Sequence, residues 1–500
     1  MSTEHSHVTA SMLYNYVKCE HRPWMDLYGD PALRDDASPF VQLLWRRGRA
    51  HEDAEIGKLA GTHIAFADAA PAEREERTVE AMDRGDALIF GGRISHGNLV
   101  GEPDILRRES GRYVPGDVKS GAADEGPSSA DRKPKLHYAV QLALYVDVLE
   151  GLGRSAGRYA FVLDAHGKEV RYDFTAAKGA RTTATLWDDY EEAVAAVRAI
   201  LAGTADSTPA LSAECKGCWW YRACLAELIR SDDLTLLPDL GRSRRTPLLP
   251  YVTTVAQLAA SPPGWFLDDK GKSIVKGLSA DGIAKYRDRA ILRATNGTPY
   301  LKAPLDTMPY GTELFFDVET DSMRDRCYLH GFVVRTDRND ATEHYVSFFS
   351  DEATAASERD AFARAWSFAH SKWPCAVYIY SKAERTWWRE LQRRYPDVCS
   401  TAEVEEFFGP ATMTDLYAVV QNQSEWPTMD YSLKTLAKYL GFAWEDAHPS
   451  GSASIEWYDR YVGGEPDAKQ RILVYNEDDC RAMRVLIDAM RKLPVNETPA

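Results

Sequence analysis

Three charged residues in the first quarter of the chain have the spacing of a site for a divalent cation. Asp104 ends the segment GEPD, and Asp117 and Lys119 lie two residues apart in the segment GDVKS. Side chains two residues apart in a strand point to the same face of the sheet. Two carboxylates on neighbouring strands can hold a divalent cation, and a lysine beside them can stabilise charge on a phosphate under attack. The pattern therefore predicts metal-dependent phosphodiester chemistry.

Asp-x-Lys pairs also occur by chance on exposed strands, so further residues decide whether this one belongs to a site. His51 lies upstream in the segment GRAH, on an expected helix at 40–58. Gln141 and Tyr145 are four residues apart in an expected helix at 136–153, so they share one face of it. Polar residues at such positions favour a site over a solvated strand.

A second set of acids lies in the last third of the chain. Asp317 and Glu319 belong to the segment FFDVET, two residues apart at the end of an apolar strand. Tyr475 and Asp479 are four residues apart in the segment YNEDDC and share one face of an expected helix. Three carboxylates and a phenol are enough to bind two divalent ions and to orient a water for in-line attack on a phosphate.

Four of the eight cysteines form a pattern typical of a metal centre. Cys215, Cys218 and Cys224 are spaced C-x2-C-x5-C, and Cys19 is the only other cysteine in the first 230 residues. Four thiolates fit either Zn²⁺ or a 4Fe-4S cluster. Zinc modules usually carry two close pairs of ligands, so one remote cysteine and a trio favour the cluster. Such a group would tie together the two ends of the first domain and close a long loop.

The composition limits the classes of protein that come into question. The chain of 500 residues is long enough for about two to four domains, and its net charge of −15 excludes a surface that attracts nucleic acid everywhere. The polar N-terminus and the lack of a long apolar run predict an intracellular, cytoplasmic protein with no membrane partner. No Walker A sequence occurs, so we expect no ATP-driven motor in the chain itself.

The elements that must position these residues follow from the apolar pattern. Up to residue 230, short strands at 99–109 and 112–121 and a hairpin turning at His166-Gly167 are flanked by helices. The first of these helices is expected at 9–30, with a break at Pro23. The pattern predicts a helix-flanked sheet.

Two further regions follow. Residues 231–310 are rich in proline, and their two helical phrases indicate either an element like a helix-hairpin-helix that binds nucleic-acid backbones or a helical spacer. From residue 311, three successive strands are followed by alternating helix and strand up to about residue 492. This is the order of elements of a ribonuclease H-like fold.

Residues 8–228 resemble the RecB-type branch of the PD-(D/E)xK nucleases, and particularly its iron–sulfur members, such as the AddB nuclease domain and the CRISPR-associated adaptation nuclease with four cysteines. The resemblance rests on His51, Pro103-Asp104, Asp117-x-Lys119, Gln141-x3-Tyr145 and the four cysteines. Many members carry Glu where this chain has Asp117, and the motif accepts either.

This first resemblance implies roles for the matching residues. The histidine and both acids would bind the metal, the lysine, glutamine and tyrosine would serve the active site, and the cysteines would hold the 4Fe-4S cluster. Because an imidazole beside carboxylates favours Mn²⁺ relative to Mg²⁺, we expect Mn²⁺ as the activating ion and Mg²⁺ as the alternative.

Residues 311–490 resemble the DEDD exonucleases in the subclass that contains a tyrosine, whose members remove nucleotides from 3′ ends. The segment SLKTLAKYLG (432–441) also matches a phrase typical of one ribonuclease H-like subfamily. The middle acid of the family is usually Asp, whereas the matching stretch YSKAERTWWREL supplies Glu384, whose longer side chain would shift the second metal. Asp415, in TDLYAVV, is a further acid that we expect in a supporting role.

These patterns predict an α/β protein with a restriction-endonuclease-like nuclease domain at 1–230, a small helical region at 231–310 and a ribonuclease H-like exonuclease domain at 311–492. We expect a metal-dependent nuclease for single-stranded DNA or DNA ends in repair, recombination or defence, with RNA as an alternative substrate and a helicase acting in trans as a partner. The alternative is a nucleic-acid-binding scaffold of a helicase or defence complex with one or both sites vestigial, and Glu384 is its best support.

Overall fold

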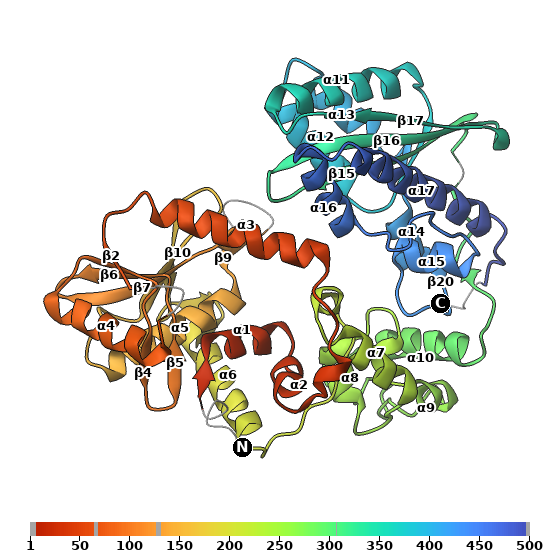
Figure 1. Cartoon of the computed structure of the whole chain (residues 1–500). Coiled ribbons are helices and arrows are strands. Elements are labelled where there is room, and N and C mark those ends of the chain that lie inside the picture. Colours follow the sequence, from red (N-terminus) through yellow and green to blue (C-terminus); the bar gives the residue numbers. More distant parts are fainter. Residues whose placement is uncertain (1–6, 65–68, 127–131, 307, 497–500) are drawn as a thin grey trace. The chain divides into compact units, whose positions relative to one another are not determined.

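The computed structural model describes residues 7–64, 69–126, 132–306 and 308–496, and it divides into two compact units (Figure 1). Unit 1 comprises residues 1–209 and 213–225, and unit 2 comprises residues 210–212 and 226–500. The two sets of acids singled out above therefore lie in different units.

Unit 1 combines short strands with longer helices. Its strands are β1 (Val8–Thr9), β2 (Thr62–His63), β3 (Leu88–Phe90), β4 (Ile94–His96), β5 (Leu99–Gly101), β6 (Ile105–Glu109), β7 (Arg112–Val118), β8 (Asp124–Glu125), β9 (Lys133–Pro134), β10 (Tyr159–Leu163), β11 (Glu169–Asp173), β12 (Ala177–Gly179) and β13 (Thr182–Thr185). Its helices are α1 (Ala10–Lys18), α2 (Arg22–Tyr28), α3 (Pro39–Ile56), α4 (Pro71–Arg84), α5 (Leu136–Gly151), α6 (Leu186–Leu201) and the first part of α7 (Tyr221–Arg230), with 3₁₀ turns at Pro31–Leu33 and Ala213–Gly217.

A six-stranded sheet with the order β11-β10-β7-β6-β3-β2 is the centre of unit 1. β6 and β7 form an antiparallel hairpin, and β10 runs parallel to β7 on its other side. α5 contacts the sheet on one side and α1 and α6 on the other, and it buries residues around most of its circumference, as a helix inside a core does. The predicted hairpin at His166-Gly167 is confirmed as the turn between β10 and β11.

Two predicted elements of unit 1 are divided in the structure. The expected strand at 99–109 is split into β5 and β6 by residues 102–104, because Pro103 has no amide hydrogen with which to continue a ladder. The expected helix at 9–30 is two helices, α1 and α2. Pro23 does not mark the break but lies in the first turn of α2, where a missing amide hydrogen costs nothing.

Unit 2 begins with a helical region and continues into a larger sheet. The helical region contains the end of α7, a 3₁₀ turn at Leu234–Leu236, α8 (Gly241–Leu248), α9 (Val255–Ala260) and α10 (Ala280–Ala294). The strands are β14 (Tyr300–Leu301), β15 (Thr312–Asp321), β16 (Arg326–Thr336), β17 (Asn339–Phe349), β18 (Ala376–Ile379), β19 (Met413–Asp415) and β20 (Ser424–Glu425). The helices are α11 (Ala355–Ser371), α12 (Ala383–Arg394), α13 (Thr401–Phe407), α14 (Leu416–Gln423), α15 (Leu433–Tyr439), α16 (Gly451–Val462) and α17 (Asp467–Met490).

β15 is the middle strand of a five-stranded sheet with the order β17-β16-β15-β18-β19. β15, β16 and β17 are antiparallel, whereas β18 and β19 continue the sheet in parallel with β15. Phe316 packs into a core with Trp388 of α12, and its neighbour Phe315 packs into another with Ile487 of α17. Helices therefore cover both faces, and the predicted order of three strands followed by alternating helix and strand is confirmed (Figure 1).

The helical region is joined to the rest of unit 2 by a buried ion pair. Arg289 of α10 is 1% exposed, and its Nε lies 2.7 Å from Glu425 Oε2 at the short ladder of β14 with β20. Lys302 Nζ lies 2.7 Å from the other oxygen of Glu425. Because removal of one partner would leave a buried charge uncompensated, this contact holds the region in place. Among the described residues, no helix is long and apolar enough to cross a membrane.

Candidate active sites

The split between β5 and β6 brings the first pair of carboxylates together. The ladder pairs Ile105 with Gly116, so Asp104, just ahead of β6, lies opposite Asp117 of β7. The Val118 amide donates a hydrogen bond of 2.8 Å to Asp104 Oδ2, and the Asp104 amide donates one of 3.4 Å to Asp117 Oδ1. Each carboxylate is thus oriented by the backbone of the neighbouring strand.

Lys119 supplies the positive charge beside these acids. Its Nζ lies 2.8 Å from Asp117 Oδ2, and the Asp117 side chain is 1% exposed. Burial lowers the pKa of the Lys119 ammonium, but the carboxylates of Asp117 and Asp104 outweigh this effect and raise the pKa above its ordinary value. Burial, and then the Asp117 carboxylate, raise the pKa of Asp104 well above its usual range. Two buried acids with one lysine are short of positive charge, which is the electrostatic condition of a cation site.

Gln141 and Tyr145 share one side of α5, as their helical spacing predicted, and Tyr145 packs against the end of β5. Gln141 Nε2 donates to the Tyr145 hydroxyl at 3.1 Å, and this hydroxyl donates to the Glu102 carbonyl at 3.3 Å. The ring lies so close to Gly101 that a Cβ there would be 2.4 Å from Tyr145 Cδ1, which requires glycine at this position. Tyr145 therefore supports the chain segment that carries Asp104.

α3 brings two residues toward this site. His51 Nε2 lies 3.2 Å from the Asp164 carbonyl oxygen. Its neighbour Glu52 was not singled out from the sequence, yet burial, Asp53 and Asp117 raise its pKa and Lys119 lowers it, so that its carboxylate belongs to the same electrostatic cluster. The signal was present in the segment RAHED, where the acid adjoins the histidine.

The cysteine segments from both ends of unit 1 lie side by side. The indole nitrogens of Trp219 and Trp220 both donate to Asp26 Oδ1 at 2.8 Å, and the Asp35 amide donates to the Trp219 carbonyl at 2.6 Å. The four cysteines, Cys19, Cys215, Cys218 and Cys224, are half-buried, whereas the other four of the chain are buried. The two ends of the unit therefore meet at the predicted ligands.

Cys218 interacts electrostatically with two of the other cysteines. Burial raises the pKa of Cys218, the Trp220 amide and Arg22 lower it, and Cys19 and Cys215 raise it further. The Trp220 amide donates to the Cys218 sulfur at 3.5 Å. Hydrogen bonds of this kind stabilise thiolate ligands in metal centres.

The acids of unit 2 converge more closely than those of unit 1. Oxygen atoms of Asp317, Glu319 and Asp479 lie within 4.8 Å of one another, the first two at the end of β15 and the third on α17. Among the described residues, this is where three acidic, imidazole or thiol side chains meet at such distances. His51, Asp104 and Asp117 do not meet this closely, nor do three of the cysteine sulfurs.

Burial and mutual repulsion disturb the ionisation of these acids. Burial, followed by the carboxylates of Glu319 and Asp479, raises the pKa of Asp317 well above its usual range. Burial and then Asp479 raise the pKa of Glu319 to about 8. Three carboxylates in a buried site can ionise together only when a cation compensates them. Hard oxygen ligands of this kind fit Mg²⁺ or Mn²⁺.

Lys434, Trp444 and Asn476 position this carboxylate group, although the sequence did not single them out. Lys434 Nζ donates to the Tyr475 hydroxyl at 2.9 Å and lies 3.3 Å from Asp479 Oδ1. Trp444 Nε1 donates to Asp479 Oδ1, and Asn476 Nδ2 donates to Asp317 Oδ2, each at 2.7 Å. Lys434 lies in the segment SLKTLAKYLG, so a signal for it was present, whereas no local pattern pointed to Trp444.

Glu384 joins the same acids from the first turn of α12. Its side chain is 2% exposed, and burial followed by Asp415 raises its pKa to about 8, while a hydrogen bond with Asp317 lowers it. Its Oε2 is buried without a hydrogen-bond partner among the described residues. A buried carboxylate oxygen without a donor is costly unless a cation contacts it. Glu384 therefore belongs to the same buried group of carboxylates as Asp317.

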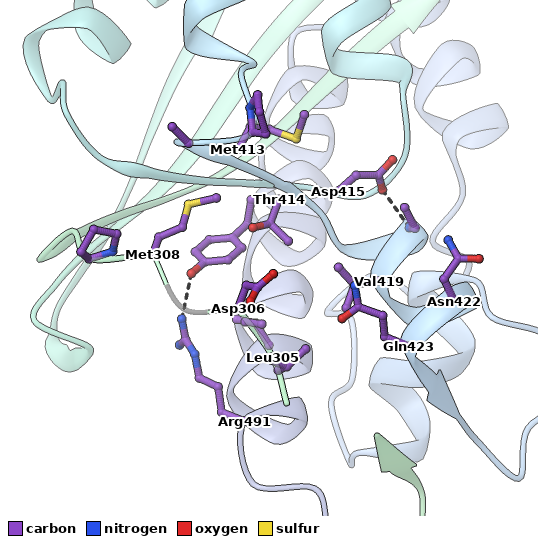
Figure 2. A pocket seen from close by; sticks show the side chains of 16 residues that line it. Leu305, Asp306, Met308, Met413, Thr414, Asp415, Val419, Asn422, Gln423 and Arg491 are labelled. Atoms are coloured by element: carbon purple, nitrogen blue, oxygen red, sulfur yellow. Dashed lines mark hydrogen bonds between the residues drawn. The ribbon is translucent and has the colours of Figure 1, made fainter. Parts of the chain in front are cut away.

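Asp415 is built into the edge of the site. Its Oδ1 accepts hydrogen bonds from the amides of Ser381 at 3.1 Å and Ala418 at 3.2 Å, and so it caps α14. Asp415 also lines a cavity of about 430 Å³, whose lining includes Leu305, Asp306 and Met308 (Figure 2). At the other end of this cavity, Arg491 donates to the Tyr378 hydroxyl at 2.8 Å. None of the three converging acids lines the cavity, whereas Asp415 both lines it and interacts electrostatically with Glu384.

Protein-family models match the two parts of the chain in which these residues lie. Residues 21–225 match the PD-(D/E)XK nuclease superfamily, and residues 314–491 match the RNase_H superfamily. No curated protein matches the chain. The first match contains Asp104, Asp117 and Lys119, and the second contains all the acids around Asp317. Both matches indicate phosphodiester hydrolysis and a nucleic-acid substrate. The predicted fold class is confirmed: the chain carries a PD-(D/E)XK nuclease domain and an RNase H-like domain, separated in the sequence by a helical stretch.

Proposed function

We propose that this protein is a metal-dependent exodeoxyribonuclease with two separate active sites, acting on single-stranded DNA or DNA ends. The observation that carries the proposal is the convergence of Asp317, Glu319 and Asp479 within 4.8 Å in a buried site. Structural ion pairs compensate buried acids with Arg or Lys, whereas Lys434 contacts only one of these three. Divalent cations would supply the positive charge that these three carboxylates still lack.

The site of unit 2 is proposed to be a DEDD exonuclease site of the tyrosine subclass, which trims 3′ ends. Asp317, Glu319, Glu384 and Asp479 would hold two divalent ions. Bound ions of this kind supply the positive charge that activates a water and stabilises the leaving oxygen. The Tyr475 hydroxyl, which Lys434 holds at 2.9 Å, would orient the attacking water. Asn476 and Trp444 keep two of the carboxylates in place through their N–H groups.

The site of unit 1 is proposed to be of the RecB type. His51, Asp104 and Asp117 would hold the ion, with Mn²⁺ favoured relative to Mg²⁺ by the imidazole. Lys119 remains protonated beside both acids and can stabilise charge that develops on the phosphate. Gln141 and Tyr145 support the segment that carries Asp104.

We further propose that Cys19, Cys215, Cys218 and Cys224 hold a 4Fe-4S cluster that joins the two ends of unit 1. The half-burial of the thiols and the hydrogen bonds between their segments support a centre here. Thiolates around one Zn²⁺ lie about 3.8 Å apart, since tetrahedral Zn–S bonds are about 2.3 Å long. A cluster of four irons holds its thiolates further apart, and one remote cysteine with a trio favours it over zinc.

The proposed role is the processing of DNA in repair, recombination or defence. RNA is the alternative substrate of the unit 2 site, and a helicase acting in trans is the proposed partner, because the chain has no Walker A motif of its own.

Removal of divalent ions tests the proposed function. Labelled single-stranded DNA should be degraded by the purified chain with Mn²⁺, and degradation should stop with EDTA and return when excess Mn²⁺ is added. The double variant Asp104→Ala, Asp317→Ala is the control, because it lacks an acid of each site and should be inactive with Mn²⁺ present. If DNA binds but is never cleaved under any of these conditions, the protein is a scaffold and the proposal is wrong.

The roles assigned to Lys119 and Asp104 can be separated by measuring metal binding and turnover on the same proteins, in an Asp317→Ala, Asp479→Ala background. Lys119→Ala should lower turnover by at least about a hundredfold, because removal of one group that stabilises transition-state charge has effects of this size. It should still bind Mn²⁺ in calorimetry, since Lys119 is no ligand. Asp104→Ala should lose turnover and Mn²⁺ binding together. Equal loss of Mn²⁺ binding in both variants would contradict the assignment.

A further inference from the structure

α3 exposes large apolar side chains next to the unit 1 site. Of its 18 residues, only Leu43 is buried, whereas Leu44 is 37% and Trp45 is 50% exposed. Their side chains leave the helix about 100° apart, so Trp45 shares its exposed side with Arg49, one turn further on, and not with Leu44. Trp45 and Arg49 thus form a small exposed surface in the first half of α3.

Helical spacing places this surface in line with the catalytic residues. Gly48 and His51 follow Leu44 by four and seven residues, and Glu52 follows Trp45 by seven, so all of them lie toward one side of α3. This side faces the site: a Cβ on Gly48 would lie 3.9 Å from Ser120 Oγ, one residue after Lys119, and Glu52 interacts with Lys119 and Asp117. Seven residues of helix span about 10 Å, so Trp45 lies about this far along α3 from Glu52.

Within one turn of Trp45 on either side, the charged residues of α3 are all arginines. Arg46 and Arg49 are exposed on the same two turns of α3, although the chain as a whole has a net charge of −15. Aromatic side chains that stack on bases, together with arginines that contact phosphates, are the elements of surfaces that bind single strands without sequence preference. A protein partner would not require these arginines at the entrance to a site for an anionic polymer.

We propose that Trp45, Arg46 and Arg49, here called the α3 shelf, bind a single strand of nucleic acid on its path to Asp104 and Asp117. Trp45 stacks on a base, and the two arginines contact the flanking phosphates. The helix rise of about 10 Å between Trp45 and Glu52 corresponds to about three stacked nucleotides at about 3.4 Å each. This inference rests on the proposed function of the unit 1 site and names the part of the substrate that this site holds.

Trp45→Ala tests the shelf, with Trp265→Ala as the matched control. Trp265 is 55% exposed and lies in the helical region of unit 2, so it reports the general effect of losing an exposed indole. Both changes are made in the full chain carrying Asp104→Ala and Asp317→Ala, and binding of a fluorescent 12-nucleotide single strand is followed by anisotropy. Trp45→Ala should raise the Kd by about fivefold or more, because the stacking of one base is lost. Trp265→Ala should leave the Kd unchanged.

Cleavage provides a second, independent readout. In the Asp317→Ala background, the loss of kcat/KM caused by Trp45→Ala should be larger for a 12-nucleotide strand than for a dinucleotide, which is too short to reach the shelf. If the Asp104-dependent site cleaves DNA but Trp45→Ala changes neither binding nor the length dependence, the shelf is wrong and the proposed function stands. If nothing is cleaved but Trp45→Ala weakens binding, the proposed function fails and the shelf stands as a binding surface. A lower thermal midpoint with unchanged binding would show that Trp45 packs against protein, which also overturns the inference.

Discussion

Replacing Asp317 with Ala should lower the trimming of 3′ ends by at least about a thousandfold, because loss of a ligand removes transition-state stabilisation of several kcal/mol and each 1.36 kcal/mol is tenfold in rate. Asp479→Ala should have the same effect, since its carboxylate lies within 4.8 Å of Asp317 and Glu319. Cleavage that depends on Asp104 should continue in both variants, because its acids lie in the other unit. Asp104→Ala should show the converse pattern. Rates are measured on strands labelled at either end, so that the two activities are read separately.

Replacements of Glu384 test whether the trimming of 3′ ends depends on the unit 2 site. Its carboxylate is buried with one oxygen lacking a donor, so Glu384→Ala should lose trimming as Asp317→Ala does. Glu384→Asp shortens the side chain but keeps the charge, and it should retain or raise trimming if the extra methylene only displaces the second metal. If no activity of the wild-type chain survives Asp104→Ala on any 3′ end, of DNA or RNA, unit 2 is a binding scaffold with a vestigial site.

Replacing Cys19 with Ala should destabilise unit 1 by up to about 5 kcal/mol, the scale of closing a loop of about 200 residues by a cross-link. The reason is that Cys19 is the one proposed ligand from the N-terminal end of the unit, whereas the other three lie at its C-terminal end. Protein purified without oxygen should be brown and contain iron, and each of the variants Cys19→Ala, Cys215→Ala, Cys218→Ala and Cys224→Ala should lose the colour. Visible absorption, iron content and urea unfolding provide the three measurements.

Cys375→Ala is the matched control for these variants. Cys375 is buried in unit 2, away from the four proposed ligands in sequence, and its replacement should leave colour and iron content unchanged. Stoichiometric zinc without iron in anaerobically purified protein would overturn the cluster and show that a zinc ion joins the two ends of unit 1 instead. Brown protein whose colour persists in Cys19→Ala would overturn the assignment of the remote ligand.

The sequence alone determined those parts of the sites that depend on local spacing. Asp317 and Glu319 alternate along one strand, and Tyr475 and Asp479 lie one turn apart on one helix, so each pair shares a face wherever its element packs. The order of strands and helices in unit 2 follows from apolar runs bounded by turns, and it agrees with the sheet that the structure shows. The pairing of Asp104 with Asp117 followed from neighbouring strands joined by a short turn.

The tertiary structure alone decided which residues complete these sites and how they ionise. Lys434 and Trp444 reach Asp479 from segments that are far from it in the sequence, and no periodicity encodes such a contact. The inclusion of Glu52 in the electrostatic cluster of Asp117 depends on how α3 lies against the sheet. The raised pKa of Glu319 arises from burial and from a carboxylate on another element, which exist only when the chain is folded. Spacing along the chain specifies neighbours within one element, whereas distances between elements are set by packing and sheet register.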